Sequence, residues 1–243
     1  METFWITTVA ALWGAGAGLL IPRAAYRLSV PADMPWRTVC PAGHPVGGIA
    51  DGWLGWARCA SGDLYGPRTP LLAVVSAGIC TALAAGVGAR PELLVWLLLS
   101  PAAVLLAVVD FAAHRLPDVL TLPLAVAAVV LLGVVALLPG AGGSWTSALL
   151  GSLTLGVFYF VFFLISQGLG FGDVKLALVL GAVLGWYGWP FVLVGTFAGY
   201  LFGALYGIGM MLAGRADRSS RIPFGPFLLT GTLAGMLLGA CTS

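Results

Sequence analysis

The sequence predicts an all-α polytopic membrane protein with about eight transmembrane helices and one loop region after the first helix. Hydrophobic residues make up 60% of the chain and charged residues only 8%, against about 25% charged in an ordinary soluble domain. The mean hydropathy is +1.03. Long runs such as residues 124–138 do not alternate apolar and polar residues, as the strands of a transmembrane barrel would. A net charge of +2 gives no support to nucleic-acid binding.

The apolar runs and the breakers between them place the individual helices. We expect helices at residues 4–21, 70–88, 92–110, 118–138, 145–166, 173–186, 189–213 and 223–240. The sixth is short for a lipid bilayer, which takes about 20 residues to cross. We therefore expect this helix to begin below the membrane surface and to carry Asp173 down with it.

Residues 22–69 are not apolar enough to span a membrane. They contain five Arg, three Asp, one His and many Gly and Pro, which is typical of an irregular cytoplasmic loop. The predicted organisation is therefore a first transmembrane helix at residues 1–21, this loop at 22–69 and a membrane-embedded domain at 70–243. Because the arginines follow the first apolar run, we expect that run to be an uncleaved anchor.

The distribution of basic residues predicts the orientation in the membrane, because cytoplasmic loops carry an excess of Lys and Arg. If the N-terminus lies outside, ten of the eleven basic residues fall on the cytoplasmic side and only Arg90 falls outside. In this orientation Asp110, Asp118 and Asp173 all lie at cytoplasmic helix ends.

These three aspartates are the candidate functional residues. Asp110 ends an apolar helix, where the helix dipole disfavours a negative charge by roughly 0.3–1 kcal/mol, so function explains it better than structure. Asp118 follows Pro117 and suits an N-cap of the next helix, although its carboxylate could also support a site. Asp173 is ambiguous, because it precedes an apolar run and could be an N-cap.

Asp173 closes the string Gly170-Phe171-Gly172-Asp173. Because 35 of the 243 residues are glycine, this string alone is weak evidence for a motif. Its physical interest is that glycines leave the backbone uncovered beside a carboxylate. An extended peptide could approach there and form hydrogen bonds.

Three segments taken together resemble a known family. They are residues 110–124 (DFAAHRLPDVLTLPL), 170–182 (GFGDVKLALVLGA) and 222–227 (IPFGPF). In sequence and in order they are similar to the motifs of the bacterial type IV prepilin peptidases, which are intramembrane aspartyl proteases of the GxGD type. The resemblance covers nearly the whole chain and is strong from about residue 101 onward.

The resemblance implies a catalytic pair, Asp110 and Asp173. It also implies supporting or substrate-binding roles for the residues around them, namely Asp118, Gly170, Gly172 and Lys175. From its position alone, we interpret Lys175 as a membrane-interface residue whose ammonium group reaches toward the headgroups.

The family implies a reaction, a substrate and a location. Two neighbouring carboxyls do not easily both ionise, so one would polarise the scissile carbonyl while the other activates a water. The peptidase step would need no cofactor. The substrate would be a prepilin or pseudopilin, held by its apolar helix in the same lipid bilayer and cut after a short basic leader. The enzyme would lie in the bacterial plasma (inner) membrane, with its active site facing the cytoplasm.

The first loop departs from the family pattern. Long, bifunctional members carry two C-x-x-C pairs that look like a four-thiolate zinc site. This chain has Cys40-Pro-Ala-Gly-His44 and Cys59-Ala-Ser-Gly-Asp63. Because half of the thiolates are missing, we expect no metal here. Cys40, His44 and Cys59, with Asp63, are only weak candidates for metal ligands.

The methyltransferase half of the bifunctional family also matches poorly. Residues 68–73 (RTPLLA) lack the carboxylate of the family's corresponding stretch, and residues 18–23 (GLLIPR) differ from its usual pattern near the first helix. The sequence therefore predicts peptidase activity and leaves N-methylation with S-adenosylmethionine without support.

Two alternatives from other functional classes stay open. The aspartates could be ion or proton sites of a secondary transporter, as intramembrane carboxylates often are, although a transporter would more naturally show broken helices in both halves of a repeat. The chain could also be an inactive family member that serves as a scaffold for pilus assembly.

Overall fold

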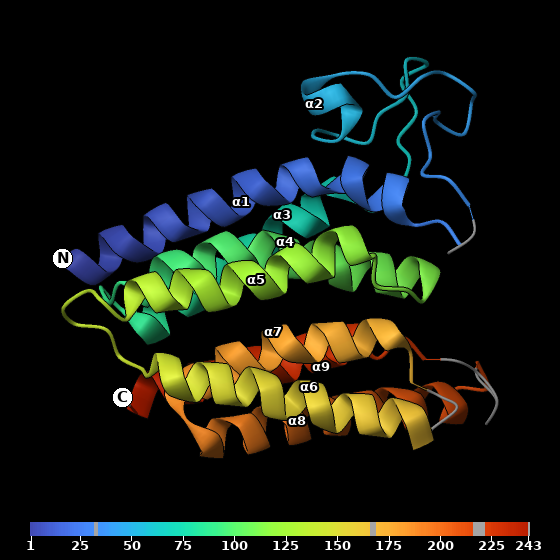
Figure 1. The fold of residues 1–243 in the computed structure, drawn as a ribbon. Coiled ribbons are helices and arrows are strands. Elements are labelled where there is room, and N and C mark those ends of the chain that lie inside the picture. Colours follow the sequence, from blue (N-terminus) through green and yellow to red (C-terminus); the bar gives the residue numbers. More distant parts are fainter. Residues whose placement is uncertain (32–33, 166–168, 216–221, 243) are drawn as a thin grey trace. The chain divides into compact units, whose positions relative to one another are not determined.

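The protein is seen in a computed structural model, which describes residues 1–31, 34–165, 169–215 and 222–242. It is built from helices (Figure 1). These are α1 (Glu2–Leu28), α2 (Ile49–Gly52), α3 (Thr69–Val87), α4 (Glu92–Ala113), α5 (Asp118–Val135), α6 (Trp145–Ile165), α7 (Phe171–Tyr187), α8 (Trp189–Leu212) and α9 (Gly225–Thr242). Within the described ranges, β-pairing is limited to two isolated bridges in the first loop.

The predicted all-α membrane fold is confirmed. A helix overlaps each of the eight predicted ranges, with ends that differ at several of them, and the short α2 is additional. Among the described residues, seven helices are long and apolar enough to cross a membrane, and α7, with 17 residues, is shorter than these. The number of actual membrane spans stays a prediction. The last residue of the predicted helix at 145–166 lies outside the described residues.

Helix α1 continues beyond the predicted end at residue 21. It passes through Pro22 and ends at Leu28, although a proline inside a helix removes one backbone hydrogen bond. Ala25 is fully buried and Leu28 is 1% exposed. Packing of these added turns therefore outweighs the local cost of the proline.

Contacts divide the chain into two compact units. The first comprises Met1–Ala89 and Trp96–Arg115, and therefore contains α1, α2, α3 and most of α4. The second comprises Arg90–Val95 and Leu116–Ser243, and contains the first turn of α4 and α5 to α9. The domain boundaries expected from the sequence stay a prediction.

In the first unit, α1 packs closely against α3. A Cβ atom added at Gly18 would lie 2.6 Å from the carbonyl oxygen of Leu72. Membrane helices associate through such small residues, because lipid gives apolar side chains no reason to cluster. On α1, the Trp13 indole also donates a hydrogen bond of 2.8 Å to the Leu97 carbonyl on α4.

Two arginines near the end of α1 hold the first loop, which lies with α2 over that end of the helix (Figure 1). Arg23 donates hydrogen bonds to the carbonyls of Trp56 (2.9 Å) and Gly47 (2.7 Å). Arg27 donates one to the carbonyl of Asp51 (2.7 Å). The loop is thus tied to the helix through its backbone.

The second unit is organised around α7, against which α5, α6, α8 and α9 pack. Most residues of α7 from Val174 to Trp186 are buried. A helix that is hydrophobic on all sides belongs in an interior. The position of α7 is therefore set by protein contacts around it.

Glycines allow α6 and α7 to come within backbone contact. A Cβ added at Gly151 would lie 2.5 Å from the Gly181 carbonyl oxygen, and one added at Gly185 would lie 2.6 Å from the Ser147 carbonyl oxygen. Any side chain at these positions would push the two helices apart.

The second unit contains a buried carboxylate in the first turn of α4. Glu92 is fully buried, and both of its oxygens lie 3.2 Å from the Gly142 N–H. Its Oε1 also lies 3.7 Å from Nε of Arg90. Arg90 in turn donates a hydrogen bond to the carbonyl of Ala240. One ion pair therefore connects the start of α4, the segment before α6 and the end of α9.

The contact between α6 and α7 predicts the effect of a single methyl group. We expect Gly151→Ala to lower stability by about 1–3 kcal/mol, the usual cost of overpacking. Gly209→Ala on α8 is the matched control, because a Cβ there meets nothing within 4 Å and the change favours the helix. The measurement is thermal unfolding of both variants and wild type in one detergent. Equal midpoints for the two variants would contradict the close packing.

Candidate active site

The Gly-x-Gly-Asp string forms the start of α7. Gly170 precedes the helix in an extended conformation, and Asp173 lies in the first helical turn. Oδ2 of Asp173 accepts a 3.0 Å hydrogen bond from the Gly170 N–H. The Asp173 N–H donates one of 3.0 Å to the Gly170 carbonyl. The N-cap is therefore Gly170, and Asp173 supports it from a position where the helix dipole favours negative charge.

The two glycines of the string have different surroundings. Gly170 is exposed, as expected for backbone that a peptide could approach. Gly172 instead faces Leu116, because a Cβ added to it would lie 2.9 Å from Cβ of Leu116. Its small size lets the residues before α5 meet the start of α7. The Leu-Pro-Asp and Gly-x-Gly-Asp segments are thus neighbours within the second unit.

A salt bridge joins these two segments. Nζ of Lys175 lies 2.6 Å from Oδ1 of Asp118. The prediction that Asp118 caps α5 is wrong, since α5 follows Pro117 and has no side-chain cap. The carboxylate binds the nearby ammonium group instead.

The membrane-interface position of Lys175 stays a prediction, and the structure adds the protein contacts of its side chain. Its side chain is only 15% exposed, while that of Asp118 is 62% exposed. The ammonium group also lies over the Phe171 ring, 4.7 Å from the ring centroid. An ion pair and an aromatic face therefore hold the ammonium beside the first turn of α7.

An aromatic cluster near Asp173 was not predicted. Tyr159 of α6 is 1% exposed, and its hydroxyl interacts electrostatically with both Asp173 and Tyr200. The Tyr159 and Tyr200 rings stack with centroids 6.2 Å apart. The Tyr200 and Phe224 rings lie 5.2 Å apart. The only signal in the sequence was a tyrosine inside an apolar helix, a pattern that core packing explains equally well.

Asp110 belongs to the first unit, and Asp173 to the second. Helix α4 extends to Ala113, so Asp110 lies in its last turn instead of ending it. The residue is 5% exposed, and its backbone carbonyl accepts the His114 N–H at 2.8 Å. Asp110 is therefore a buried acid at the C-terminal end of an apolar helix, as the sequence indicated.

The chain after α4 is fixed to the segment after α1. Arg115 donates hydrogen bonds to the carbonyls of Val30 (3.0 Å) and Pro31 (2.7 Å). Because Arg115 follows Asp110 by little more than one helical turn, these bonds restrain the end of α4 that carries the acid.

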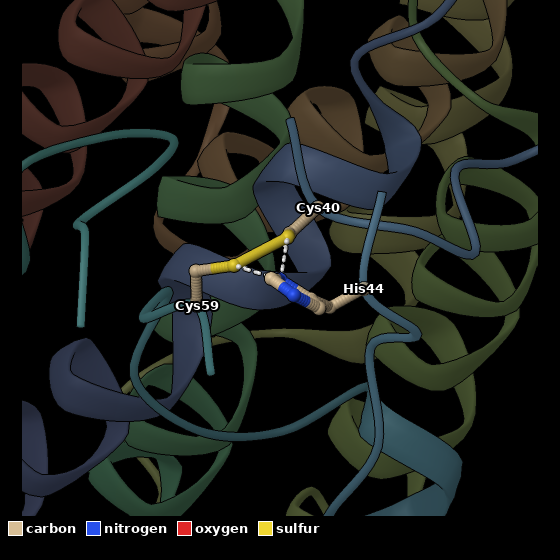
Figure 2. A group of neighbouring side chains, drawn as sticks. All are labelled: Cys40, His44 and Cys59. Atoms are coloured by element: carbon tan, nitrogen blue, oxygen red, sulfur yellow. Dashed lines mark hydrogen bonds between the residues drawn. A yellow bond between two sulfur atoms is a disulfide. The ribbon is translucent and has the colours of Figure 1, made fainter. Parts of the chain in front are cut away.

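The weak metal candidates of the first loop lie together. Cys40, His44 and Cys59 offer ligand atoms within 4.8 Å of one another (Figure 2). The sulfur atoms of the two cysteines are joined as a disulfide. Asp63 is not part of this group; its carboxylate accepts a hydrogen bond of 2.9 Å from Ser61.

These groups suit acid–base chemistry. The carboxyl of Asp110 is buried in the last turn of α4. The carboxyl of Asp173 lies in the first turn of α7. The carboxyl of Asp118 forms the ion pair with Lys175. Carboxyl groups are among the side chains that act as general acids and bases in enzymes.

Comparisons with known proteins agree with the motifs. Residues 97–208 match the type IV leader peptidase family. A prepilin leader peptidase/N-methyltransferase of Aeromonas hydrophila is 35% identical over 219 residues, which cover 83% of this chain and 69% of that protein. The protein of the same description from Burkholderia pseudomallei is 31% identical over 241 residues, which cover 93% of this chain and 73% of that protein. No solved structure matches.

The chain therefore belongs to the type IV leader peptidase family, a family of proteases. Its apolar helices make it a multi-pass membrane protein. The matched residues 97–208 include both Asp110 and Asp173.

The Asp118–Lys175 ion pair predicts energetic coupling between the two motif segments. Because Asp118 is largely exposed, we expect a coupling of only about 0.5 kcal/mol. Asp118→Asn and Lys175→Met should each lower the unfolding midpoint slightly, and the double variant should cost less than their sum. Thermal unfolding of the four proteins in one detergent measures this. Strictly additive effects would show that the pair does not join the segments.

Proposed function

We propose that this chain is a membrane-embedded aspartic endopeptidase that removes the leader peptide from type IV prepilins or pseudopilins. The observation that carries the proposal is the family match, which spans both candidate aspartates. The relatives from Aeromonas hydrophila and Burkholderia pseudomallei, both described as prepilin leader peptidases, support the choice of substrate.

In the proposed mechanism Asp110 and Asp173 act as a pair on one water molecule. One carboxyl holds a proton and polarises the scissile carbonyl, while the other removes a proton from the attacking water. The water oxygen bonds to the carbonyl carbon, the C–N bond breaks and the amine leaves with a proton. Because such a pair titrates as a unit, neither residue is permanently the acid or the base. This step needs no cofactor.

The surroundings of each aspartate support its role. Asp173 accepts a hydrogen bond from the Gly170 N–H at the N-terminal end of α7, which fixes one of its carboxylate oxygens. Asp173 is only partly buried. Asp110 is 5% exposed, so protein atoms enclose most of its carboxyl group.

Asp118 and Lys175 are proposed as positioning residues. Lys175 follows Asp173 by two residues in α7. Its 2.6 Å ion pair with Asp118 joins the start of α5 to the helical segment that carries Asp173. The exposed Gly170 leaves backbone where an extended leader segment can form hydrogen bonds.

We further propose that the N-terminus lies outside and that the active site faces the cytoplasm of the bacterium. The basic residues support this orientation, although Arg218 and Arg221 lie outside the described residues. Arg90, the only basic residue that it places outside, is paired with the buried Glu92. Its charge is therefore balanced locally and weighs little against the rule.

The aspartate pair is tested by cleavage of a co-expressed prepilin. We expect Asp110→Asn and Asp173→Asn each to abolish processing, because an amide can neither donate nor remove the required proton. Asp118→Asn should retain part of the activity, since its proposed role is indirect. Gly209→Ala is the control for expression and membrane insertion. Processing that continues without Asp110 or Asp173 would reject the aspartyl mechanism.

The same strains distinguish the alternatives. A transporter would show ion-dependent solute uptake without any peptide cleavage. An inactive scaffold would bind its pilus partners equally well in wild type and in the Asp110→Asn and Asp173→Asn double variant, and would leave the prepilin uncut in both.

The orientation is tested with a cysteine that the chain already carries. Cys241 is exposed near the end of α9, and the proposed topology places it outside. We expect a membrane-impermeant maleimide to label it in intact spheroplasts. Ser61→Cys in a Cys241→Ser background, which moves the reactive thiol into the first loop, should react only after permeabilisation. The reverse pattern would invert the topology.

A further inference from the structure

We propose that Tyr159 of α6 is a positioning residue, whose hydroxyl donates a hydrogen bond to the carboxylate of Asp173 when the substrate is bound. The inference rests on the proposed peptidase function and deepens it, because it adds residues of α6 and α8 to a site so far described by its acids.

The packing of α6 against α7 places Tyr159 beside the first turn of α7. A Cβ atom added at Gly156 would touch the side chain of Leu178. In the other direction, the rings of Phe163 and Phe171 lie 5.5 Å apart. The two helices are therefore antiparallel here. Tyr159 follows Gly156 by three residues and precedes Phe163 by four, so all three share the face of α6 that meets α7.

Asp173 occupies the matching place on α7. It lies between Phe171 and Leu178 in the first helical turn, as Tyr159 lies between their two partners on α6. The electrostatic interaction between the Tyr159 hydroxyl and Asp173 agrees with this register. The phenol and the carboxylate are therefore neighbours within the second unit.

The Tyr159 hydroxyl is a buried donor in need of an acceptor. The residue is 1% exposed, and its hydroxyl has no hydrogen-bond partner among the described residues. Most buried polar groups are paired, because an unpaired one has lost its water without compensation. Of the acceptors that a tyrosine can use, a carboxylate forms one of the strongest bonds.

A bond from Tyr159 would complete the support of the Asp173 carboxylate. Oδ2 already accepts the Gly170 N–H at 3.0 Å, and an ionised carboxylate has room for about four donors. Hydrogen bonds in active sites are often long or poorly aligned without substrate and tighten in the complex. Held from two directions, the carboxylate would keep one orientation toward the attacking water.

Tyr200 of α8 is placed to orient Tyr159. The two rings are stacked, with centroids 6.2 Å apart and planes 21° apart, and their hydroxyls interact electrostatically. A hydroxyl has one proton to donate and two lone pairs that accept. Tyr159 can therefore accept a hydrogen bond from Tyr200 while it donates its own proton to Asp173.

The segment at residues 222–227 supports this pair of tyrosines from behind. The ring of Phe224 lies 5.2 Å from the ring of Tyr200. Phe224 precedes α9 directly, and α9 packs against both α7 and α8. The inference therefore gives this segment a role, which is to hold the tyrosines in place.

The first test is the variant Tyr159→Phe, which keeps the ring and removes one oxygen. Loss of a hydrogen bond to a charged group should lower kcat about 10–100-fold. KM should stay near the wild-type value, because the bond acts on the reacting carboxylate. The measurement uses the full-length chain in detergent and a synthetic prepilin peptide that contains the leader and the apolar helix. A wild-type kcat would overturn the inference.

Thermal unfolding separates this role from a structural one. Because the hydroxyl is unpaired in the structure, its removal should leave the unfolding midpoint of Tyr159→Phe at or above that of wild type. Tyr206→Phe is the matched control, since it makes the same change on α8 at a residue that is 40% exposed; it should keep kcat and KM. A fall in kcat together with a lower midpoint in Tyr159→Phe would assign the hydroxyl to folding and overturn the inference.

A double variant tests the order of the chain. Tyr200→Phe should lower kcat less than Tyr159→Phe does. The variant with both changes should be no slower than Tyr159→Phe alone, because Tyr200 acts through Tyr159. Effects that multiply would overturn this order.

Asp173→Asn in the same assay keeps the two proposals distinguishable. If Asp173→Asn is inactive while Tyr159→Phe cleaves at the wild-type rate, the inference fails and the proposed function stands. If Asp173→Asn still cleaves the peptide, the proposed function fails and the inference fails with it.

Discussion

The backbone contact between α6 and α7 is the constraint on which the rest of the second unit depends. Gly151, Gly181 and Gly185 remove side chains from this contact, and α7 becomes the buried centre against which four other helices pack. A helix of 17 residues is shorter than a bilayer usually requires. Contacts with other helices therefore set the position of α7, whose first turn carries Asp173.

The two sequence motifs of the second unit act as one structure. Gly172 has no side chain, so Leu116 packs closely against it. In the same region Asp118 forms an ion pair with Lys175. Each contact is modest alone, because Asp118 is largely exposed and surface ion pairs contribute little. Together they fix the start of α5 to the start of α7.

Much of the fold could be predicted because a bilayer leaves the chain few choices. Backbone groups in lipid must bond internally, so long apolar runs become helices. The end of α1 was misplaced because local rules stop a helix at Pro22, whereas burial of Ala25 and Leu28 continues it. The role of Asp118 was missed for a related reason, since its partner is remote in sequence. The sequence around Tyr159 does not distinguish a tyrosine near the site from one that only packs in the core.

The first loop shows what spacing rules cannot describe. A rule based on paired cysteines finds only half of a four-thiolate pattern in this chain, because glycines occupy positions 43 and 62. In the structure Cys40 and Cys59 begin two turns with the same backbone hydrogen bonds, and their sulfur atoms are joined as a disulfide. The two turns meet in a small core with Ala57 and Tyr65. This pairing depends on backbone geometry that repeats at a distance along the chain, which local sequence rules do not describe.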